Sequence, residues 1–260
     1  MSCRAKVPLA VLLFALLYSL YEVEARPRSA TEIFLVGYSG KSFAVVKLDP
    51  KTADIKLFWK DPSGRPYKTI HNLDAWLKKS KTNLIAAMNA GMFDGTESRQ
   101  PLGLHVENGL LIKPLNRSSG SGNFYLKPNG VFYIRNLAAK IVPTEQFSLP
   151  AGDLRLATQS GPLLVHVGEI HPRFEMNSRS MWLRSGVGID SQGSVYWVHS
   201  MEPVTFYEFA VFFRDKLKCR DALYLDGAIS RIYAPPIAPM PQHESALGGI
   251  LAVVERESSR

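Results

Sequence analysis

The stretch that decides the fold is "TFYEFAVFFRDKLKCRDALYLDGAIS", Thr205 to Ser230. Thr205 and Glu208 have the Thr-x-x-Glu spacing of a capping box, which predicts that a helix begins here. Apolar side chains follow at helical spacing and predict one core-facing side of that helix: Phe206, Phe209, Ala210, Phe213 and Leu217. The next apolar run, "ALYLD", has no polar alternation, as in a strand buried on both faces. The sequence therefore predicts a helix followed by a buried strand that ends at Asp226.

A second stretch has the same order. Asn72 is a candidate cap for a helix over "LDAWLKKS", and the buried run "NLIAAMN" follows it and ends at Asn89. Four turn signals separate other apolar runs and predict hairpins: Asp49–Thr52, Asn108-Gly109, Asn129-Gly130 and Ser191–Gly193. We expect an α+β fold, with a mixed, largely antiparallel sheet rich in hairpins and a few packed helices.

The first 25 of the 260 residues have the features of a secretory signal peptide. Arg4 and Lys6 precede an apolar stretch that is shorter than the roughly 20 residues of a membrane span, and Ala25 ends a plausible cleavage site. An uncleaved anchor is the alternative. We expect a secreted or periplasmic protein with residues 26–260 as a single domain and no stable membrane insertion after cleavage.

The formal net charge of +8 favours anionic partners. For an exported protein, phosphate-bearing glycans or membrane surfaces are more plausible partners than nucleic acid. The charges are scattered, so an ordinary basic surface is an equal alternative. Of the two cysteines, Cys3 lies in the signal and Cys219 is left without a partner, as an inert buried thiol. The sequence contains no tight Cys/His cluster, so we expect neither a metal nor another cofactor, and no pattern indicates an oligomeric state.

Four segments place a polar side chain beside a glycine at the edge of an apolar run, where glycine would let a ligand approach the backbone. They are Asn89–Phe93, Gln159–Pro162, Arg184–Gly188 and Asp226–Ser230. Each one alone is as well explained by an ordinary turn. Together they favour a binding site.

The ordered motifs "NAGMFD", "TQSGPLLV", "GEIHPRF", "RSGVGID" with "GSVYWVHS", and "ALYLDGAIS" resemble the phosphodiester glycosidase family, and most closely its compact bacterial secreted branch. The resemblance covers most of residues 26–260. It implies that family's fold and a hydrolase that cleaves a sugar-1-phosphodiester bond in an envelope or exopolysaccharide glycan. This chain has Ala228 and Ile229 where a mammalian member that removes N-acetylglucosamine has glycines. The resemblance therefore leaves the identity of the sugar open.

The resemblance also implies that the two buried strands end side by side, with Asn89 and Asp226 facing one pocket that Arg184 and the Ser160-Gly161 backbone complete. It implies roles for individual residues as well. Asp226 would be the carboxylate at the anomeric carbon, as nucleophile or water-activating base. Arg184 would bind the phosphate as a bidentate fork, and Asn89 would hold sugar hydroxyls or orient Asp226. Glu202 is the candidate second carboxylate and Arg179 the alternative phosphate ligand. The full set of expected substrate-binding residues is Gly91, Phe93, Gln159, Ser160, Gly161, Arg179, Glu202, Gly227 and Ser230. The rival interpretation is a non-catalytic glycan-binding protein of the envelope or exopolysaccharide, and a third is an envelope interaction protein with a closed pocket.

Overall fold

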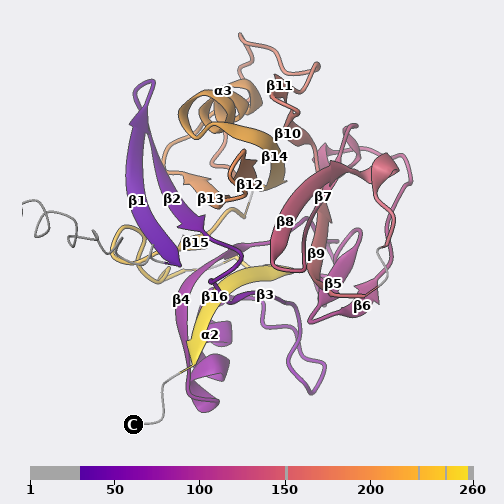
Figure 1. Cartoon of the computed structure of the whole chain (residues 1–260), viewed down its shortest axis with the longest axis vertical. Helices are drawn as coiled ribbons and strands as arrows, with labels where there is room; N and C mark the ends of the chain where they lie inside the picture. The colour runs from indigo at the N-terminus through magenta and orange to yellow at the C-terminus, as the bar shows by residue number, and fades with distance from the viewer. Residues whose placement is uncertain (1–29, 150–151, 228, 244, 257–260) are drawn as a thin grey trace, which may run out of the picture.

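The computed structural model describes residues 30–149, 152–227, 229–243 and 245–256 (Figure 1). The predicted signal peptide and Ala228 lie outside the described residues.

The predicted α+β class with largely antiparallel strands is confirmed, and the strands are divided among three sheets. The seven-stranded sheet has the order β1 (Thr31–Tyr38), β2 (Lys41–Leu48), β13 (Val195–Ser200), β12 (Ser185–Asp190), β14 (Cys219–Asp226), β10 (Leu163–His166) and β11 (Glu169–Ile170). The four-stranded sheet has the order β15 (Ile232–Tyr233), β4 (Thr82–Asn89), β16 (Ile250–Arg256) and β3 (Ile55–Phe58). The five-stranded sheet has the order β6 (Leu110–Lys113), β5 (His105–Glu107), β9 (Leu154–Ser160), β7 (Gly130–Arg135) and β8 (Ala138–Pro143). Each pairing between these described strands is antiparallel.

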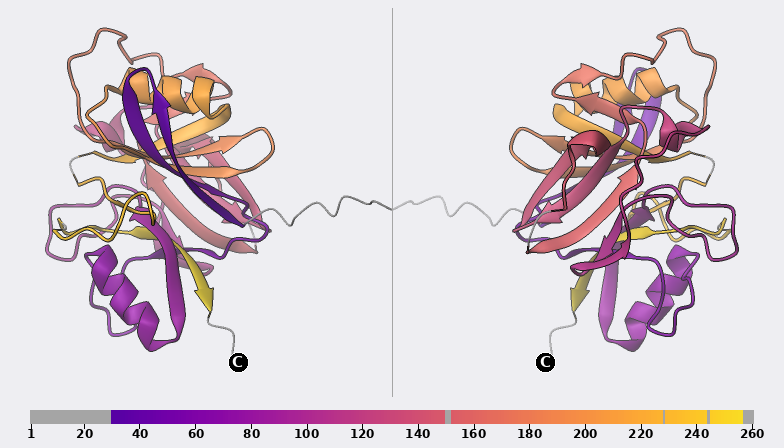
Figure 2. Two further views of the ribbon diagram at one scale, coloured as in Figure 1. Left: turned by 90° about the vertical axis from the view of Figure 1, so that its left-hand side faces the viewer. Right: turned by 90° about the vertical axis from the view of Figure 1, so that its right-hand side faces the viewer.

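The three sheets share one core. Trp197 and Leu223 enter it from the seven-stranded sheet, Met88 and Leu251 from the four-stranded sheet, and Phe132 from the five-stranded sheet. The helices cover outer faces: α2 (Ile70–Lys79) lies against the four-stranded sheet and α3 (Phe206–Val211) against the seven-stranded sheet (Figure 2). Among the described residues, neither helix is long and apolar enough to cross a membrane.

Helix α3 begins as predicted. The Glu208 backbone N–H donates to Thr205 Oγ1 at 3.1 Å, and the Thr205 N–H donates to Glu208 Oε2 at 2.7 Å, which completes the capping box. One π-helical turn, Phe212–Lys216, continues the helix. Phe209 and Phe213 are fully buried against β14 and its neighbours, so the predicted core face is confirmed.

The predicted cap of α2 is wrong by three residues. Thr69 is the N-cap, and its side chain accepts the N–H of Asn72 at 3.0 Å. The side-chain amide of Asn72 instead donates to the carbonyl of Tyr67 at 2.8 Å. Ile70 is completely buried, which explains why the helix begins one turn earlier than the apolar pattern suggested.

Two of the four predicted hairpins form, β5–β6 around Asn108-Gly109 and β12–β13 around residues 191–193. The other two predictions are wrong. The Asp49–Thr52 turn joins β2 to β3, which belong to different sheets. Asn129 does not open a hairpin, because it is buried and its amide donates to the Phe124 carbonyl at 2.7 Å. Both segments have turn chemistry, but the sheet that each following strand joins is fixed by distant partners.

Candidate active site

Three buried serine hydroxyls hold the end of β14. Ser160 Oγ donates to the Leu225 carbonyl at 3.0 Å, and the Asp226 carbonyl accepts from Ser185 Oγ at 3.1 Å and from Ser230 Oγ at 3.0 Å. The half-buried Asp226 carboxylate accepts the Gly227 N–H at 2.6 Å. Two of these serines, Ser160 and Ser230, were predicted site residues. Their hydroxyls fix the backbone from which Asp226 projects.

Asn89, at the end of β4, is linked to the same region. Its Oδ1 accepts the Arg231 N–H at 3.1 Å, and its own N–H donates to the Arg231 carbonyl at 3.3 Å. Arg231 follows Ser230 directly, so the ends of β4 and β14 are joined through two consecutive residues. The predicted closeness of the two strand ends is therefore seen, with Asn89 buried as a backbone anchor.

Arg184 is only 1% exposed. Its Nε donates to the Val204 carbonyl at 2.9 Å, and one terminal nitrogen donates to the Ser180 carbonyl at 3.0 Å. The guanidinium carbon lies 3.7 Å from the centre of the Phe206 ring. Burial lowers the pKa of this guanidinium, and interactions with Tyr224 and Glu208 oppose that effect. In this arrangement protein groups already occupy much of the Arg184 fork, so its predicted phosphate contact stays a prediction.

Tyr224 connects Arg184 to the Asp226 end of the strand. Its hydroxyl hydrogen-bonds Arg184 and Asn123, and burial raises its pKa. A Cβ added to Gly227 would lie 2.2 Å from the same hydroxyl. The structure thus places a buried phenol, a buried guanidinium and the Asp226–Gly227 backbone in one continuous group.

The glycines at these strand ends are needed for packing against protein. A Cβ added to Gly91 would lie 2.3 Å from the Gln159 carbonyl, and the Gly91 N–H donates to Thr158 Oγ1 at 3.1 Å. A Cβ added to Gly161 would lie 2.6 Å from Asn129 Cβ. Protein atoms thus occupy the positions that a side chain would take at Gly91 and Gly161, and the expected approach of a ligand to this backbone stays a prediction.

The side chains of two other predicted residues are held by separate protein contacts. The Gln159 amide is buried: its Oε1 accepts the N–H groups of Leu104 and Asn116, and its Nε2 donates to the Asn116 carbonyl. Phe93 packs against the backbone of Gly248.

Two predicted polar residues, Glu202 and Arg179, are also placed by the structure. Glu202 accepts the Ser42 N–H at 2.8 Å and so links the end of β13 to β2. In the sheet, β12 lies between β13 and β14. Arg179 is exposed on the loop between β11 and β12.

His199 is a site neighbour that the sequence did not single out. It lies opposite Ser185 in the β12–β13 pairing, and its ring hydrogen-bonds the Ser230 backbone. Burial lowers its pKa to about 4. Its Nδ1 is buried with no hydrogen-bond partner among the described residues. The histidine is therefore neutral near pH 7 and packs against the segment that carries Ser230 and Arg231.

Sequence reasoning also missed Arg231, Tyr224 and Asn123. Arg231 is half-buried, and its Nη1 donates to the Ser230 carbonyl at 2.7 Å. Its position directly after the "DGAIS" motif could have marked it as a site residue. No local pattern marked Asn123, because its contact with Tyr224 joins residues 101 positions apart in the chain.

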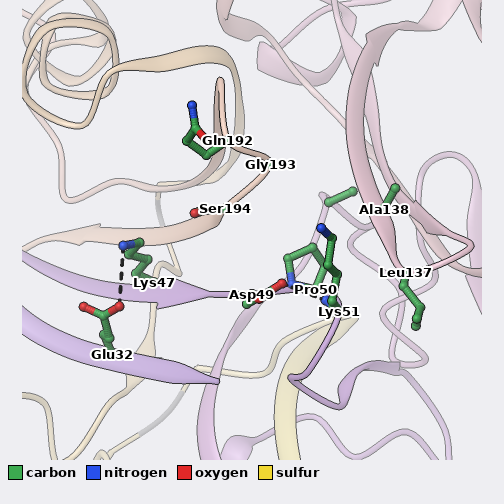
Figure 3. Close-up of a pocket in the computed structure, with 11 residues that line it drawn as sticks. Glu32, Lys47, Asp49, Pro50, Lys51, Leu137, Ala138, Gln192, Gly193 and Ser194 are labelled. Carbon is green, nitrogen blue, oxygen red and sulfur yellow. Dashed lines mark hydrogen bonds and ion pairs between the residues drawn. The ribbon is translucent and has the colours of Figure 1, made fainter. Parts of the chain in front are cut away.

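A cleft of about 440 Å³ lies at the opposite end of the seven-stranded sheet (Figure 3). Lys47 and Glu32 line one side, with their charged atoms 3.5 Å apart, and Leu137 and Ala138 line the other. The β12–β13 turn borders it, whereas Asp226 is paired with the beginning of β12. This cleft therefore contains none of the predicted site residues. Within the described ranges, His, Cys, Asp and Glu side chains form no group of three or more that could hold a metal ion.

Comparison with known proteins decides the family. The model of the phosphodiester glycosidase family matches residues 82–235, which include both strand ends and the buried arginine. The chain belongs to the phosphodiester glycosidase family, as its motifs predicted. Membership supports a hydrolase of the glycosidase type that acts on glycan phosphodiesters.

Relatives and solved structures agree with this assignment. The uncharacterized protein YigE of Escherichia coli (strain K12) is 39% identical over 186 residues, which are 72% of this chain and 72% of that protein. The catalytic domain of zebrafish N-acetylglucosamine-1-phosphodiester alpha-N-acetylglucosaminidase, auto-inhibited by its pro-peptide, has a TM-score of 0.61 at 18% identity, covering 87% of this chain and 83% of that one. A putative exported protein from Burkholderia pseudomallei has a TM-score of 0.55 at 12% identity, covering 82% and 74%. At these identities the two structures establish a shared fold.

Proposed function

We propose that this protein is a secreted or periplasmic hydrolase that cleaves a sugar-1-phosphodiester bond in an envelope or exopolysaccharide glycan. The observation that carries the proposal is the partly exposed Asp226 carboxylate on a strand end fixed by three serine hydroxyls, inside the segment that matches the family. Catalytic groups need such fixed positions. The zebrafish protein of the same fold is named for a sugar phosphodiester, which supports this substrate class.

Asp226 is the proposed carboxylate at the anomeric carbon. A phosphate monoester departs readily, so the reaction depends less on a strong general acid than ordinary glycoside hydrolysis does. What it needs is a carboxylate that attacks the sugar or activates water, together with a cation for the phosphate. Glu202 is the less favourable second carboxylate, because the backbone of Ser42 already binds it.

Arg231 is the better-placed phosphate ligand. It is half-buried, whereas Arg184 is completely buried. Asn89 holds the Arg231 backbone, and the Arg231 guanidinium, which donates from Nη1 to the Ser230 carbonyl, carries further N–H donors that suit a phosphate oxygen pair. Arg184 would then have a structural role beside the site, through its hydrogen bond with Tyr224 and its stacking on Phe206.

The test is an assay of the purified protein against a panel of sugar-1-phosphodiesters, with release of free sugar as the readout and neutral glycosides of the same sugars as controls. We expect sugar release from at least one phosphodiester. Arg231→Lys, which keeps the charge and loses the fork, should lower kcat/KM for that phosphodiester by about 10- to 100-fold, as expected when a hydrogen bond to a charged group is lost. The neutral glycoside should be affected much less.

The matched comparison is Arg184→Lys. It should lower the melting temperature, because lysine cannot reproduce the bonds to Val204 and Ser180 together with the stacking on Phe206. If Arg184→Lys retains the wild-type melting temperature but loses phosphodiester turnover specifically, the phosphate contact belongs to Arg184. A wild-type protein that binds a glycan phosphodiester and never releases sugar would favour the non-catalytic binding protein.

A further inference from the structure

Four large apolar side chains are exposed beside the candidate site. They are Met176, Met181, Trp182 and Met201, which are 68%, 43%, 58% and 41% exposed, and we call them the apolar tip. Exposed apolar groups that gather in one place on a soluble protein mark a contact surface more often than singly scattered ones do.

The loop that carries most of the apolar tip is anchored at its base. Phe174 stacks on Phe206 with ring centres 4.9 Å apart, and the Ser180 carbonyl accepts the Arg184 side chain. Trp182 forms an isolated antiparallel bridge with Val204, which joins the loop to the connection between β13 and α3 that also carries Met201. Figure 1 shows the loop between β11 and β12 rising above α3 and away from the sheets. Anchored in this way, the loop projects its apolar side chains outward from the body of the protein.

The segment that carries Trp182 borders the candidate active site. The carbonyl of Leu183, the residue after Trp182, lies 3.2 Å from the position that a Cβ on Gly227 would occupy. Gly227 is bonded to the Asp226 carboxylate. The backbone beside Trp182 therefore lies against the Asp226–Gly227 backbone.

The loop that carries most of the apolar tip has more exposed basic than acidic side chains. Arg173 and Arg179 are exposed on it, against one exposed acid, Glu175. Glu202, next to Met201, is half-buried and accepts the Ser42 N–H. Exposed arginines flanking apolar side chains complement anionic lipid headgroups, and tryptophan is enriched where a membrane meets water. Methionine side chains adapt to irregular apolar partners. A projecting apolar loop with basic flanks thus suits a bilayer surface better than it suits a polar sugar chain.

We propose that the apolar tip docks on an anionic lipid surface and presents the site to an amphiphilic substrate, a glycosyl phosphodiester whose alcohol carries a hydrocarbon chain. The substrate part of this proposal rests on the proposed function. The docking part needs no catalysis. The two parts can therefore be measured separately.

Docking is tested by sedimentation of the full protein with vesicles of phosphatidylcholine and phosphatidylglycerol. We expect binding that falls when phosphatidylglycerol is left out or when salt is raised. Trp182→Ala combined with Met176→Ser should weaken binding by about tenfold or more, since two apolar side chains lose their burial. The control is Leu110→Ser, a similarly exposed apolar residue on the five-stranded sheet, which should not change binding. Failure of the wild type to bind either vesicle, or equal loss in the control, overturns the docking proposal.

The substrate part is tested with one sugar-1-phosphate esterified to a short alcohol and to a long-chain alcohol. We expect Trp182→Ala to lower kcat/KM for the long-chain ester by about tenfold more than for the short one. Equal loss on both esters would identify Trp182 as a sugar-stacking residue and overturn the lipid assignment. If no ester is cleaved but vesicle binding depends on the apolar tip, the proposed hydrolysis fails and the docking surface stands.

Discussion

The two helix–strand units of this protein are alike in sequence and different in outcome. In the first, α2 leads to β4, which ends at Asn89, and in the second, α3 leads to β14, which ends at Asp226. Asn89 is buried, and its side chain is bonded to the Arg231 backbone. Asp226 is half-buried, with its backbone rather than its side chain held by the serines. One strand end therefore anchors the chain, and the other presents a carboxylate.

The difference shows what determines the role of a polar residue at a strand end. An apolar run followed by a polar residue and glycine locates the end of a buried strand. Whether that residue becomes an anchor or a reactive group depends on which distant segments pack over it. Arg231 covers Asn89, and it comes from the segment directly after Asp226. The second unit thereby fixes the role of the first.

Asp226→Asn is the substitution expected to have the largest effect. Asparagine retains an Oδ1 that can accept the Gly227 N–H, so the melting temperature should stay close to that of the wild type. If Asp226 is the catalytic carboxylate, sugar release should fall by about 10²- to 10⁴-fold. Steady-state kinetics and thermal unfolding of the same preparation measure both effects.

The matched control is Asp190→Asn at the other end of β12. Asp190 also holds a turn, since its Oδ1 accepts the N–H groups of Gln192 and Ser194. The Asp190→Asn variant should lose no activity beyond the effect of any change in stability. Full activity in Asp226→Asn, with wild-type stability, would falsify the catalytic assignment and leave Asp226 as a turn residue.

Phe209→Ala tests the helix of the second unit. The ring is fully buried, and it lies against Gly186, where a Cβ would be 3.1 Å from it. The free energy of unfolding should fall by about 3–5 kcal/mol, measured by urea denaturation. Leu73→Ala, at a fully buried position of α2, is the counterpart and should cost about 2–5 kcal/mol. A Phe209→Ala protein with an unchanged melting temperature and no ligand binding would contradict the core assignment.

How far the sequence predicts this fold depends on how far apart in the chain the residues that determine each feature are. The capping box of Thr205 and Glu208 and the turn at Asn108-Gly109 are local, and both form as predicted. The turn at Asp49 was also recognisable locally, but the sheet that β3 joins depends on β16, about 200 residues further along. Local chemistry fixes elements and turns, whereas partners far along the chain fix how the sheets divide.

The candidate site follows the same rule. The sequence located Asp226, Ser230 and Asn89 because each ends or follows a buried run. It assigned Arg184 to the phosphate from its motif and its guanidinium fork, and could not show that Phe206 and Val204 surround the guanidinium. The contact of Tyr224 with Asn123 had no local signal either, because it depends on how the sheets pack.

His199 gives the second unit a pH dependence. Burial depresses the folded-state pKa of His199 to about 4, from an ordinary value of 6.5. Stability is therefore complete above about pH 6.5 and falls as the pH drops towards 4, because the unfolded chain binds the proton first. The whole loss is about 3 kcal/mol. Urea denaturation between pH 4 and 8 measures it.

His199→Gln should remove most of this slope relative to the wild type. His171 is also buried with a lowered pKa, so part of the dependence should remain in the variant. Parallel stability curves for wild type and variant across this pH range would show that His199 titrates normally in the folded protein.

The smallest expected effect compares the two helix caps. Thr205→Ala removes the acceptor for the Glu208 N–H, and Thr69→Ala removes the acceptor for the Asn72 N–H. Each should lower the free energy of unfolding by about 1 kcal/mol. Thr205→Ala should lower the free energy of unfolding slightly more than Thr69→Ala. The Glu208 side chain accepts the Thr205 N–H and so completes a capping box, whereas the Asn72 side chain bonds Tyr67 instead. Adding Glu208→Ala to Thr205→Ala should then cost less than Glu208→Ala costs alone, since half of the box is already lost. Strict additivity in that double-mutant cycle would mean that the two bonds act independently, and the caps of α2 and α3 would be energetically equivalent.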